Sequence, residues 1–311
     1  MPDTLTLTAC AKINLTLDVF SKRADGYHSI ATVMQAISLH DTLTFAHSAE
    51  PGIEFTCDAP DSPDIPVDAS NLVVRAAQTV LDYAAQNGGN LTDGIRIHLV
   101  KRIPSQAGLG GGSSDAAAAL RGTASLHNLV IPQREKLALA AEIGSDVPFF
   151  LVGGRAAARG RGESLTPLPD DPKDSGFWLV VVKPEASVST AWAYGELDAI
   201  PERQSHRATK RMEEALLAGD AGRLLAFQSN DFELPVFTHH PSIAWLRDEL
   251  QMAGAVTAHL CGSGAAVYGI AENRASAERI SALLRPRYPR TFVARSLTRA
   301  ESNPFTPIVV E

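Results

Sequence analysis

The chain has 311 residues, of which 45% are hydrophobic and 20% charged, and its formal net charge at pH 7 is −7. These values are typical of a globular protein with one large or two medium domains. The acidic balance argues against a nucleic-acid-binding protein, and no apolar run approaches the length of about 18 residues that a membrane-spanning helix needs.

The cysteines and the first residues of the chain indicate a cytoplasmic protein. Cys10, Cys57 and Cys261 lie far apart and form no C-x-x-C pair, so we expect neither disulfides nor a zinc site. Residues 1–6 lack the basic and apolar regions of a secretory signal. Our expectation is a cytoplasmic protein, a monomer or weak homodimer, that binds neither nucleic acid nor a membrane and has no dedicated metal site.

Strand and helix patterns are intermixed along the chain. Strand patterns, marked by alternating or β-branched residues, cover residues 4–19, 42–56, 94–102, 177–183, 258–271 and 290–297. Helix patterns, marked by apolar spacing or by caps, cover residues 71–86, 114–127, 132–144, 189–197, 208–218, 242–252 and 274–284. Because the order is not a repeating βαβ unit, we predict an α+β fold rather than a doubly wound sheet.

Two segments rich in proline and aspartate indicate surface loops. Residues 58–68 carry three prolines and four aspartates, and we assign them no function. Residues 167–176 carry three prolines and three aspartates and are the best candidate for a loop between two halves. We predict two domains, residues 1–160 and residues 161–311.

The segment from Pro104 to Leu120 is the most informative stretch, because four glycines and two serines run into an alanine-rich helix pattern. Glycine allows close approach of the backbone, Ser113 or Ser114 is a natural N-cap, and a helix N-terminus offers free N–H groups to phosphate. A P-loop needs a lysine after Gly112 and a dinucleotide fingerprint needs a further glycine, and both are missing. Two interpretations remain: a phosphate-binding loop of another kind, and a flexible linker or tight helix entry.

Three motifs in this order resemble those of the GHMP kinases, the family of galactokinase, homoserine kinase, mevalonate kinase and phosphomevalonate kinase. They are residues 11–15 (Ala-Lys-Ile-Asn-Leu), residues 104–117 around the glycines, and residues 259–268 (His-Leu-Cys-Gly-Ser-Gly-Ala-Ala-Val-Tyr). The resemblance implies an ATP-dependent small-molecule kinase of two domains. Its N-terminal domain, like domain 2 of ribosomal protein S5, would bind ATP, and its C-terminal domain would be ferredoxin-like.

Two further motifs narrow the resemblance to one branch of the family. Residues 23–28 (Arg-Ala-Asp-Gly-Tyr-His) and 144–148 (Gly-Ser-Asp-Val-Pro) are similar to those of the branch acting in non-mevalonate isoprenoid biosynthesis. That branch phosphorylates the 2-hydroxyl of a branched sugar alcohol carried on cytidine diphosphate. The alternatives are a GHMP kinase with a small acceptor, of the homoserine or mevalonate type, and a nucleotide-binding protein without catalysis. A dinucleotide-dependent oxidoreductase is a more distant alternative.

Asp146 and Lys12 are the candidate catalytic residues. Phosphoryl transfer to an alcohol needs a base for the hydroxyl proton, and Asp146 precedes an apolar segment, where a carboxylate is either a base or a helix N-cap. Lys12 lies in a strand expected to be buried, where lysine is rare unless paired, and Asp146 is its natural partner. The alternative is a lysine that snorkels from a strand edge. The resemblance favours Asp146 as base and implies that Asn14 binds the substrate.

The resemblance also implies which residues bind the acceptor. A cytosine pocket needs an aromatic stack and a polar anchor, and Tyr27 and His28 match the family's residues for this task, with Tyr194 on the other side. The alternative for Tyr194 is ordinary packing, and for residues 262–264 a hairpin turn. The full predicted set for the acceptor is Asn14, Tyr27, His28, Thr190, Tyr194, Gly262, Ser263 and Gly264, with Thr190 near the diphosphate.

ATP is expected at the glycine-rich segment. Lys101, just before it, would touch the nucleotide or be a solvated strand end. Mg²⁺ is implied by ATP chemistry and would bind mainly through phosphates and water. Asp115 is expected to point outward or toward the metal. The predicted ATP-binding residues are Lys101, Pro104, Ser105, Gln106, Ala107, Gly108, Leu109, Gly110, Gly111, Gly112, Ser113 and Ser114.

Overall fold

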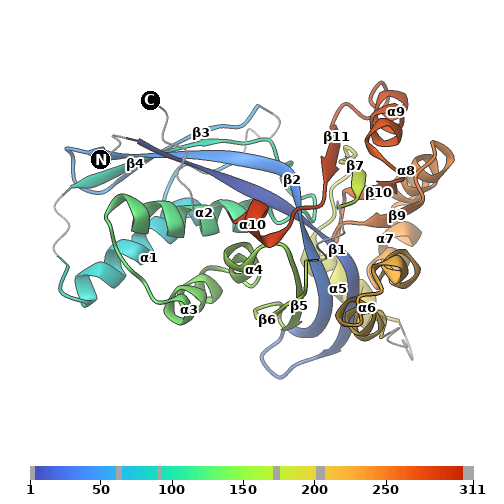
Figure 1. Cartoon of the computed structure of the whole chain (residues 1–311), viewed down its shortest axis with the longest axis horizontal. Helices are drawn as coiled ribbons and strands as arrows, with labels where there is room; N and C mark the ends of the chain where they lie inside the picture. The colour runs from blue at the N-terminus through green and yellow to red at the C-terminus, as the bar shows by residue number, and fades with distance from the viewer. Residues whose placement is uncertain (1–3, 61–64, 90–92, 171–175, 201–206, 304–311) are drawn as a thin grey trace.

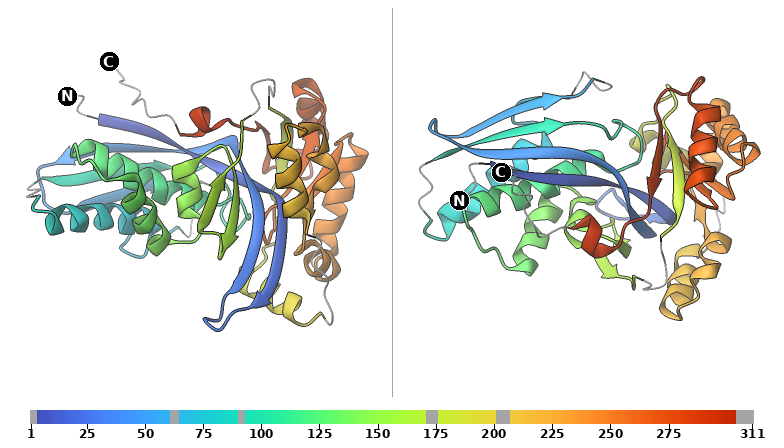
Figure 2. Two further views of the ribbon diagram at one scale, coloured as in Figure 1. Left: turned by 60° about the horizontal axis from the view of Figure 1, so that its bottom comes forward. Right: turned by 45° about the horizontal axis from the view of Figure 1, so that its top comes forward.

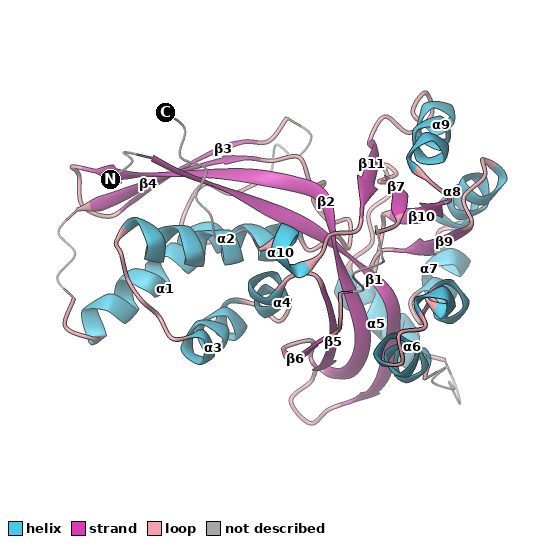
Figure 3. Cartoon of the chain, in the orientation of Figure 1, coloured by secondary structure: helices cyan, strands magenta, loops and turns pink. Residues whose placement is uncertain are grey.

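The computed structural model of the chain describes residues 4–60, 65–89, 93–170, 176–200 and 207–303. Two β-sheets lie next to each other, and each has helices packed on one face (Figures 1 and 3). Residues 61–64 and 171–175 of the two proline-rich loops fall outside the described residues. In the ranges that are described, no helix combines the length and apolarity needed to cross a bilayer.

The first sheet is built around a long antiparallel hairpin. In the described part of the chain its strands are β1 (Thr4–Lys22), β2 (His28–Ser48), β3 (Ile53–Asp58), β4 (Gly94–Val100), β5 (Arg155–Gly160), β6 (Ser164–Pro167) and β8 (Ser229–Asn230). The order is β3-β4-β2-β1-β8, and β5 pairs with both β2 and β6. Residues 42–48 of β2 pair with β4 and residues 30–35 pair with β5, so β2 changes partner along its length. The hairpin of β1 and β2 therefore extends beyond β3 and β4 (Figure 2).

Four helices cover one face of this sheet: α1 (Leu72–Gln86), α2 (Gly111–Leu126), α3 (Gln133–Ile143) and α4 (Val147–Val152). Asn71 caps α1, since its side-chain oxygen accepts the N–H of Val73 over 2.9 Å. Helix α2 contacts β1, β2, α1 and α4, and its alanines at 116–119 are completely buried. Alanine has high helix propensity and no bulk beyond Cβ, so this helix can lie close to neighbours on several sides.

The second sheet is antiparallel, with β7 (Trp178–Val182), β9 (Thr257–Leu260), β10 (Val267–Ala271) and β11 (Thr291–Arg295) in the order β11-β7-β10-β9. Helices α8 (Pro241–Met252) and α9 (Arg274–Leu284) pack on this sheet. The remaining elements are α5 (Thr190–Asp198), α6 (Ala208–Leu217), α7 (Glu233–His239) and two 3₁₀ turns, η1 (Ala221–Arg223) and η2 (Leu225–Phe227). The short helix α10 (Arg299–Ser302) returns to the first sheet, where it contacts β2.

A shared core joins the two sheets. Ile13 and Leu15 of β1 pack in one buried cluster with Leu179 and Val181 of β7 and with Tyr268 of β10. The hydroxyl of Tyr268 donates to the backbone carbonyl of Asn14, between Ile13 and Leu15, over 3.1 Å. Strand β1 is therefore held from both halves of the molecule.

Irregular pairing of β1 with β2 surrounds the first motif. The register shifts between Cys10 and Ala11 and again between Asn14 and Thr16. Such bulges bend a strand and change the direction of its side chains. Lys12 and Asn14 lie between the two shifts, and because they are two residues apart they share one face of the strand.

The predicted α+β fold is confirmed, and the errors lie at element ends and in short elements. Ser113 and Ser114 are wrong as N-caps: α2 begins at Gly111, after Gly110 with φ of 71°. Residues 29–41, to which the sequence analysis assigned no element, belong to β2, and α4 and α7 were not predicted. The domain boundary at residue 160 stays a prediction; β5 and β6, on either side of it, both belong to the first sheet.

Gly122 allows α2 to lie close to the first sheet. A Cβ at this position would lie 2.3 Å from the ring of Phe45, which is fully buried in β2. We expect Gly122→Ala to lower the free energy of unfolding by about 1–3 kcal/mol, despite the higher helix propensity of alanine. Gly195→Ala in α5, where nothing lies within 4 Å, is the matched control and should be neutral or stabilising. Equal stability of the two variants in urea denaturation would show that Phe45 does not limit this contact.

Candidate active site

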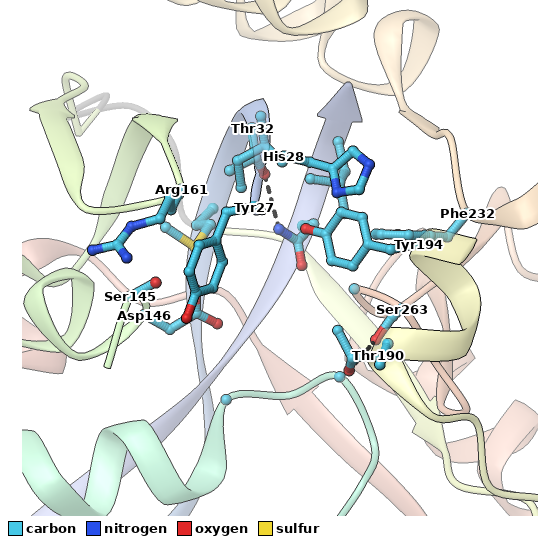
Figure 4. Close-up of a pocket in the computed structure, with 18 of the residues that line it drawn as sticks. Tyr27, His28, Thr32, Ser145, Asp146, Arg161, Thr190, Tyr194, Phe232 and Ser263 are labelled. Carbon is cyan, nitrogen blue, oxygen red and sulfur yellow. Dashed lines mark hydrogen bonds between the residues drawn. The ribbon is translucent and has the colours of Figure 1, made fainter. Parts of the chain in front are cut away.

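A cavity of about 630 Å³ is lined by residues of both halves of the molecule (Figure 4). Side chains from the β1–β2 hairpin, from α5 and from the turn between β9 and β10 face it. Most of the residues predicted for catalysis and for the acceptor line this cavity: Lys12, Asn14, Tyr27, His28, Asp146, Thr190, Tyr194, Gly262 and Ser263. Gly264 lies in the same turn, where its N–H donates to the carbonyl of Cys261.

Lys12 and Asp146, 134 positions apart in sequence, meet in this cavity. The Nζ atom of Lys12 lies 3.6 Å from Oδ2 of Asp146 and donates to Oδ1 of Asn14 over 2.8 Å. Lys12 is buried, whereas the Asp146 side chain is 35% exposed. Asp146 immediately precedes α4, but its backbone is helical and its side chain makes no capping hydrogen bond. The N-cap interpretation of Asp146 is therefore wrong, and its carboxylate faces Lys12 and the cavity.

A chain of hydrogen bonds continues from Asn14 into the hairpin. The Asn14 amide donates to the Thr32 hydroxyl over 2.8 Å, and that hydroxyl donates to the backbone carbonyl of Thr16. Both partners are buried. Because the Asn14 amide group is fixed at each end, its oxygen is directed at the ammonium group of Lys12.

The far end of the cavity carries aromatic side chains (Figure 4). The rings of His28 and Tyr194 are stacked, with centroids 4.6 Å apart and an interplanar angle of 15°. Tyr194 also meets the Phe232 ring edge-on at 4.9 Å. The Nε2 atom of His28 lies 2.7 Å from Oδ1 of Asp198. Tyr27 is separate from this stack, and 56% of it is exposed.

Three residues of α5 lie four positions apart and face the cavity. Thr190, Tyr194 and Asp198 all line it, as expected for one face of a helix. Sequence analysis identified the first two and missed Asp198, although the spacing was a usable signal. The Thr190 hydroxyl lies 2.9 Å from the hydroxyl of Ser263, so α5 and the third motif meet at this edge of the cavity.

The third motif packs directly against the glycine segment. A Cβ at Gly108 would lie 1.8 Å from the carbonyl oxygen of Cys261, so only glycine permits this approach. The N–H of Ala266 donates to the carbonyl of Ala107 over 3.3 Å. Residues 262–264 are thus a turn between paired strands, as the alternative proposed, and also a support for the glycine segment.

A second cavity of about 410 Å³ lies on the other side of the glycine segment. Gly108 and Gly110 line both cavities. Ser114 does not face the second cavity, because its hydroxyl is buried and donates to the carbonyl of Cys10. The other predicted ATP residues line it: Lys101, Pro104, Ser105, Gln106, Ala107, Gly108, Leu109, Gly110, Gly111, Gly112 and Ser113.

Lys101 is held by two carboxylates at the edge of this second cavity. Its ammonium group donates to Asp41 and, over 2.8 Å, to Asp115 of α2, and all three side chains are buried. Asp41 also accepts the backbone N–H groups of Arg102 and Ile103. The cluster joins the end of β4 to the second turn of α2. Lys101 is therefore not a solvated strand end, and Asp115 does not point outward.

Burial at this position makes the ionised form of the Asp115 carboxyl unfavourable. Its Oδ1 atom is buried without a hydrogen-bond partner among the described residues. Burial raises the pKa of the Asp115 carboxyl to about 8, although the neighbouring Lys101 lowers it. A raised pKa means that the folded protein holds this proton more tightly than the unfolded chain.

We expect Asp115→Asn to change how stability depends on pH. The contribution of Asp115 is fully present below its ordinary pKa of 3.8 and is lost as the pH rises through about 8. The free energy of unfolding of the wild type should therefore fall relative to that of Asp115→Asn between about pH 6 and pH 8.5. Urea denaturation across this range measures it, and parallel pH profiles would contradict the assignment.

Comparison with known proteins places the chain in a family. The model of the GHMP kinases N terminal domain matches residues 71–154, and that of the GHMP kinases C terminal matches residues 212–289. The 4-diphosphocytidyl-2-C-methyl-D-erythritol kinase of Moorella thermoacetica is 41% identical over 297 residues, covering 95% of this chain and 100% of the relative. The kinase of the same name from Synechocystis is 40% identical over 291 residues, covering 89% of this chain and 90% of the relative.

Solved structures agree with this placement. A crystal structure of 4-(cytidine 5'-diphospho)-2C-methyl-D-erythritol kinase superposes with a TM-score of 0.75 at 34% identity, covering 94% of this chain and 99% of the other. The homoserine kinase of Cytophaga hutchinsonii gives a TM-score of 0.71 at 20% identity, covering 96% of each chain, and so shares the fold. With both domain models matched, and relatives of about 40% identity over nearly the whole length, the chain belongs to the GHMP kinases.

Proposed function

We infer that this chain transfers the γ-phosphoryl group of ATP to the 2-hydroxyl of 4-diphosphocytidyl-2-C-methyl-D-erythritol, in non-mevalonate isoprenoid precursor biosynthesis. The observation that carries the inference is the position of the glycine segment. Gly108 and Gly110 line both the acceptor cavity and the second cavity, and Lys12 and Asp146 line the acceptor cavity beside them. A phosphoryl group of a nucleotide in the second cavity would thus be delivered next to this pair.

The second cavity suits a nucleoside triphosphate. Helix α2 begins at Gly111 without a side-chain cap, so its first backbone N–H groups are available to an anion. The dipole of this 16-residue helix favours negative charge at the same end. Lys101 lines the cavity with its charge balanced by Asp41 and its ammonium group also hydrogen-bonded to Asp115, so the positive potential here comes chiefly from the backbone.

Asp146 and Lys12 supply the chemistry on the acceptor side. The Asp146 carboxylate accepts the proton of the acceptor hydroxyl as that oxygen attacks the γ-phosphorus. The ammonium group of Lys12 lies 3.6 Å from this carboxylate and offers positive charge to the transferring group. Asn14 holds the Lys12 ammonium in place through the 2.8 Å hydrogen bond.

Mg²⁺ accompanies ATP in this chemistry, and we propose that it is bound chiefly by phosphate oxygens and water. The described residues contain no group of three or more His, Cys, Asp and Glu side chains that would hold a metal on their own. The partly exposed Asp146 carboxylate is the protein oxygen best placed to join its coordination shell. When bound, the ion neutralises charge on the phosphates.

The acceptor end fits a cytidine diphosphate conjugate. The His28–Tyr194 stack and the nearby Tyr27 ring offer aromatic faces to a base. With Asp198 accepting the Nε2–H of His28, the other ring nitrogen is an acceptor for the exocyclic amino group of cytosine. Thr190 and Ser263 supply hydroxyl donors for the diphosphate. This apparatus is larger than homoserine or mevalonate requires.

The cellular setting stays a prediction. Cys10, Cys57 and Cys261 are free thiols, which is consistent with the cytoplasmic location proposed from the sequence. A monomer or weak homodimer also stays a prediction.

Asp146→Asn tests the base. The amide is close in shape to the carboxylate but accepts no proton, so we expect kcat with the cytidyl acceptor to fall about 10²–10⁴-fold while the KM for ATP changes little. Asp248→Asn, which changes a partly exposed carboxylate of α8 that pairs with Arg247 away from the cavity, is the matched control and should retain the wild-type rate. An unchanged kcat in Asp146→Asn would remove Asp146 from the mechanism.

Asp198→Ala tests the proposed orientation of His28. Without Asp198 the ring loses the contact that selects its tautomer, so one anchor of the base weakens. We expect the KM for the cytidyl acceptor to rise about three- to tenfold, with kcat nearly constant. The inhibition constant of cytidine diphosphate should rise in Asp198→Ala and approach that of uridine diphosphate. Retained discrimination between the two nucleotides would argue against His28 as the group that recognises cytosine.

A further inference from the structure

A short turn with two left-handed glycines places Arg161 at the acceptor cavity. Arg161 lies between β5 and β6, with Gly160 at φ of 74° and Gly162 at φ of 117° on either side. Its own backbone N–H donates to the carboxylate of Glu163 over 2.6 Å. The turn is therefore well defined, and the Arg161 side chain lines the cavity (Figure 4).

The Arg161 guanidinium group lies over the ring of Tyr27, with its central carbon 4.9 Å from the ring centroid. The Tyr27 backbone is fixed, because its carbonyl accepts the N–H of Arg23 and its N–H donates to Asp25. Its side chain, by contrast, has no hydrogen bond and no other ring or cation contact within the described ranges. Arg161 is therefore the polar contact that orients an otherwise exposed ring.

Within the part of the chain that the structure describes, Arg161 has no acidic partner in the cavity. Of the carboxylates that line it, Asp146 faces Lys12 and Asp198 faces His28. Among the residues that the structure describes, no carboxylate forms an ion pair with the Arg161 guanidinium. A planar, weakly hydrated cation without a carboxylate is free to stack on an aromatic face.

We propose that Arg161 is a positioning residue for the acceptor, holding Tyr27 so that the other face of its ring stacks on the acceptor's base. The proposal rests on the function proposed above. The resulting order is guanidinium, tyrosine ring, base. A ring held before binding loses less conformational freedom when the base arrives. Arg161 thus affects acceptor binding and leaves the phosphoryl transfer step unchanged.

The test is a double-mutant cycle on Arg161 and Tyr27. We expect Arg161→Gln to raise the KM for the cytidyl acceptor about two- to fivefold, the range for a cation–π contact at an exposed site, with kcat and the KM for ATP unchanged. In the Tyr27→Ala background the same change should have no further effect, because the ring through which Arg161 acts is gone. Arg161→Lys, which keeps the cation, should restore part of the affinity.

Arg96→Gln is the matched control, because it removes an exposed arginine of β4, paired with Glu54, that does not line the cavity. An equal rise in KM on Arg161→Gln with and without the Tyr27 ring would overturn the proposal, since Arg161 would then act through its charge alone. An unchanged KM in both backgrounds would overturn it as well.

Two measurements separate this proposal from the proposed function. Turnover of the cytidyl acceptor by the wild type tests the function by itself. Calorimetry gives the dissociation constant of cytidine diphosphate for the four proteins of the cycle: the wild type, Arg161→Gln, Tyr27→Ala and the double mutant. These constants give the Arg161–Tyr27 coupling without catalysis. Turnover without coupling overturns only the role of Arg161, and coupling without turnover supports that role while overturning the kinase assignment.

Discussion

The burial of one charged group, the ammonium of Lys12, is the constraint on which the site depends. A buried ammonium is unfavourable unless a carboxylate and hydrogen-bond acceptors surround it. Strand β1 provides Asn14 on the same face as Lys12, and the segment before α4 provides Asp146. Because β1 and α4 are distant in sequence, the contact between Lys12 and Asp146 depends on the position that α4 takes in the folded N-terminal half.

The two buried lysines of the site differ in how their charges are balanced. Lys101 lies between Asp41 and Asp115, both buried, so its charge is satisfied within the protein. Lys12 has a single carboxylate partner, Asp146, which is partly exposed and faces a cavity. Lys101 therefore has a structural role, in which its hydrogen bonds connect the end of β4 to α2. Lys12 can interact with a further negative group in the cavity. Sequence spacing around either lysine does not reveal this difference, because their partners come from distant segments.

Local patterns predicted the long elements and the glycine segment, and they failed where tertiary contacts decide. Residues 71–86 were predictable because a cap and a helical period agree there. The start of α2 was not, because its first turn is set by Gly110 and by packing against β1 rather than by Ser113 or Ser114. Asp146 needed the family resemblance to be chosen over a cap. Arg161, between two glycines, had no periodic signal at all.

The nucleotide and the acceptor are proposed to bind in different cavities, which explains why the glycine segment alone could not identify the acceptor. That segment and the start of α2 present backbone N–H groups, which any phosphate can use. The cavity proposed for the acceptor is lined by side chains from the β1–β2 hairpin, from α5 and from the β5–β6 turn, which lie far apart in the sequence. Substitutions in α5 or in that turn can therefore alter which acceptor binds while Lys12 and Asp146 stay in place. On this proposal, specificity depends on separate segments that meet at Lys12 and Asp146, and only the folded cavity shows how they combine.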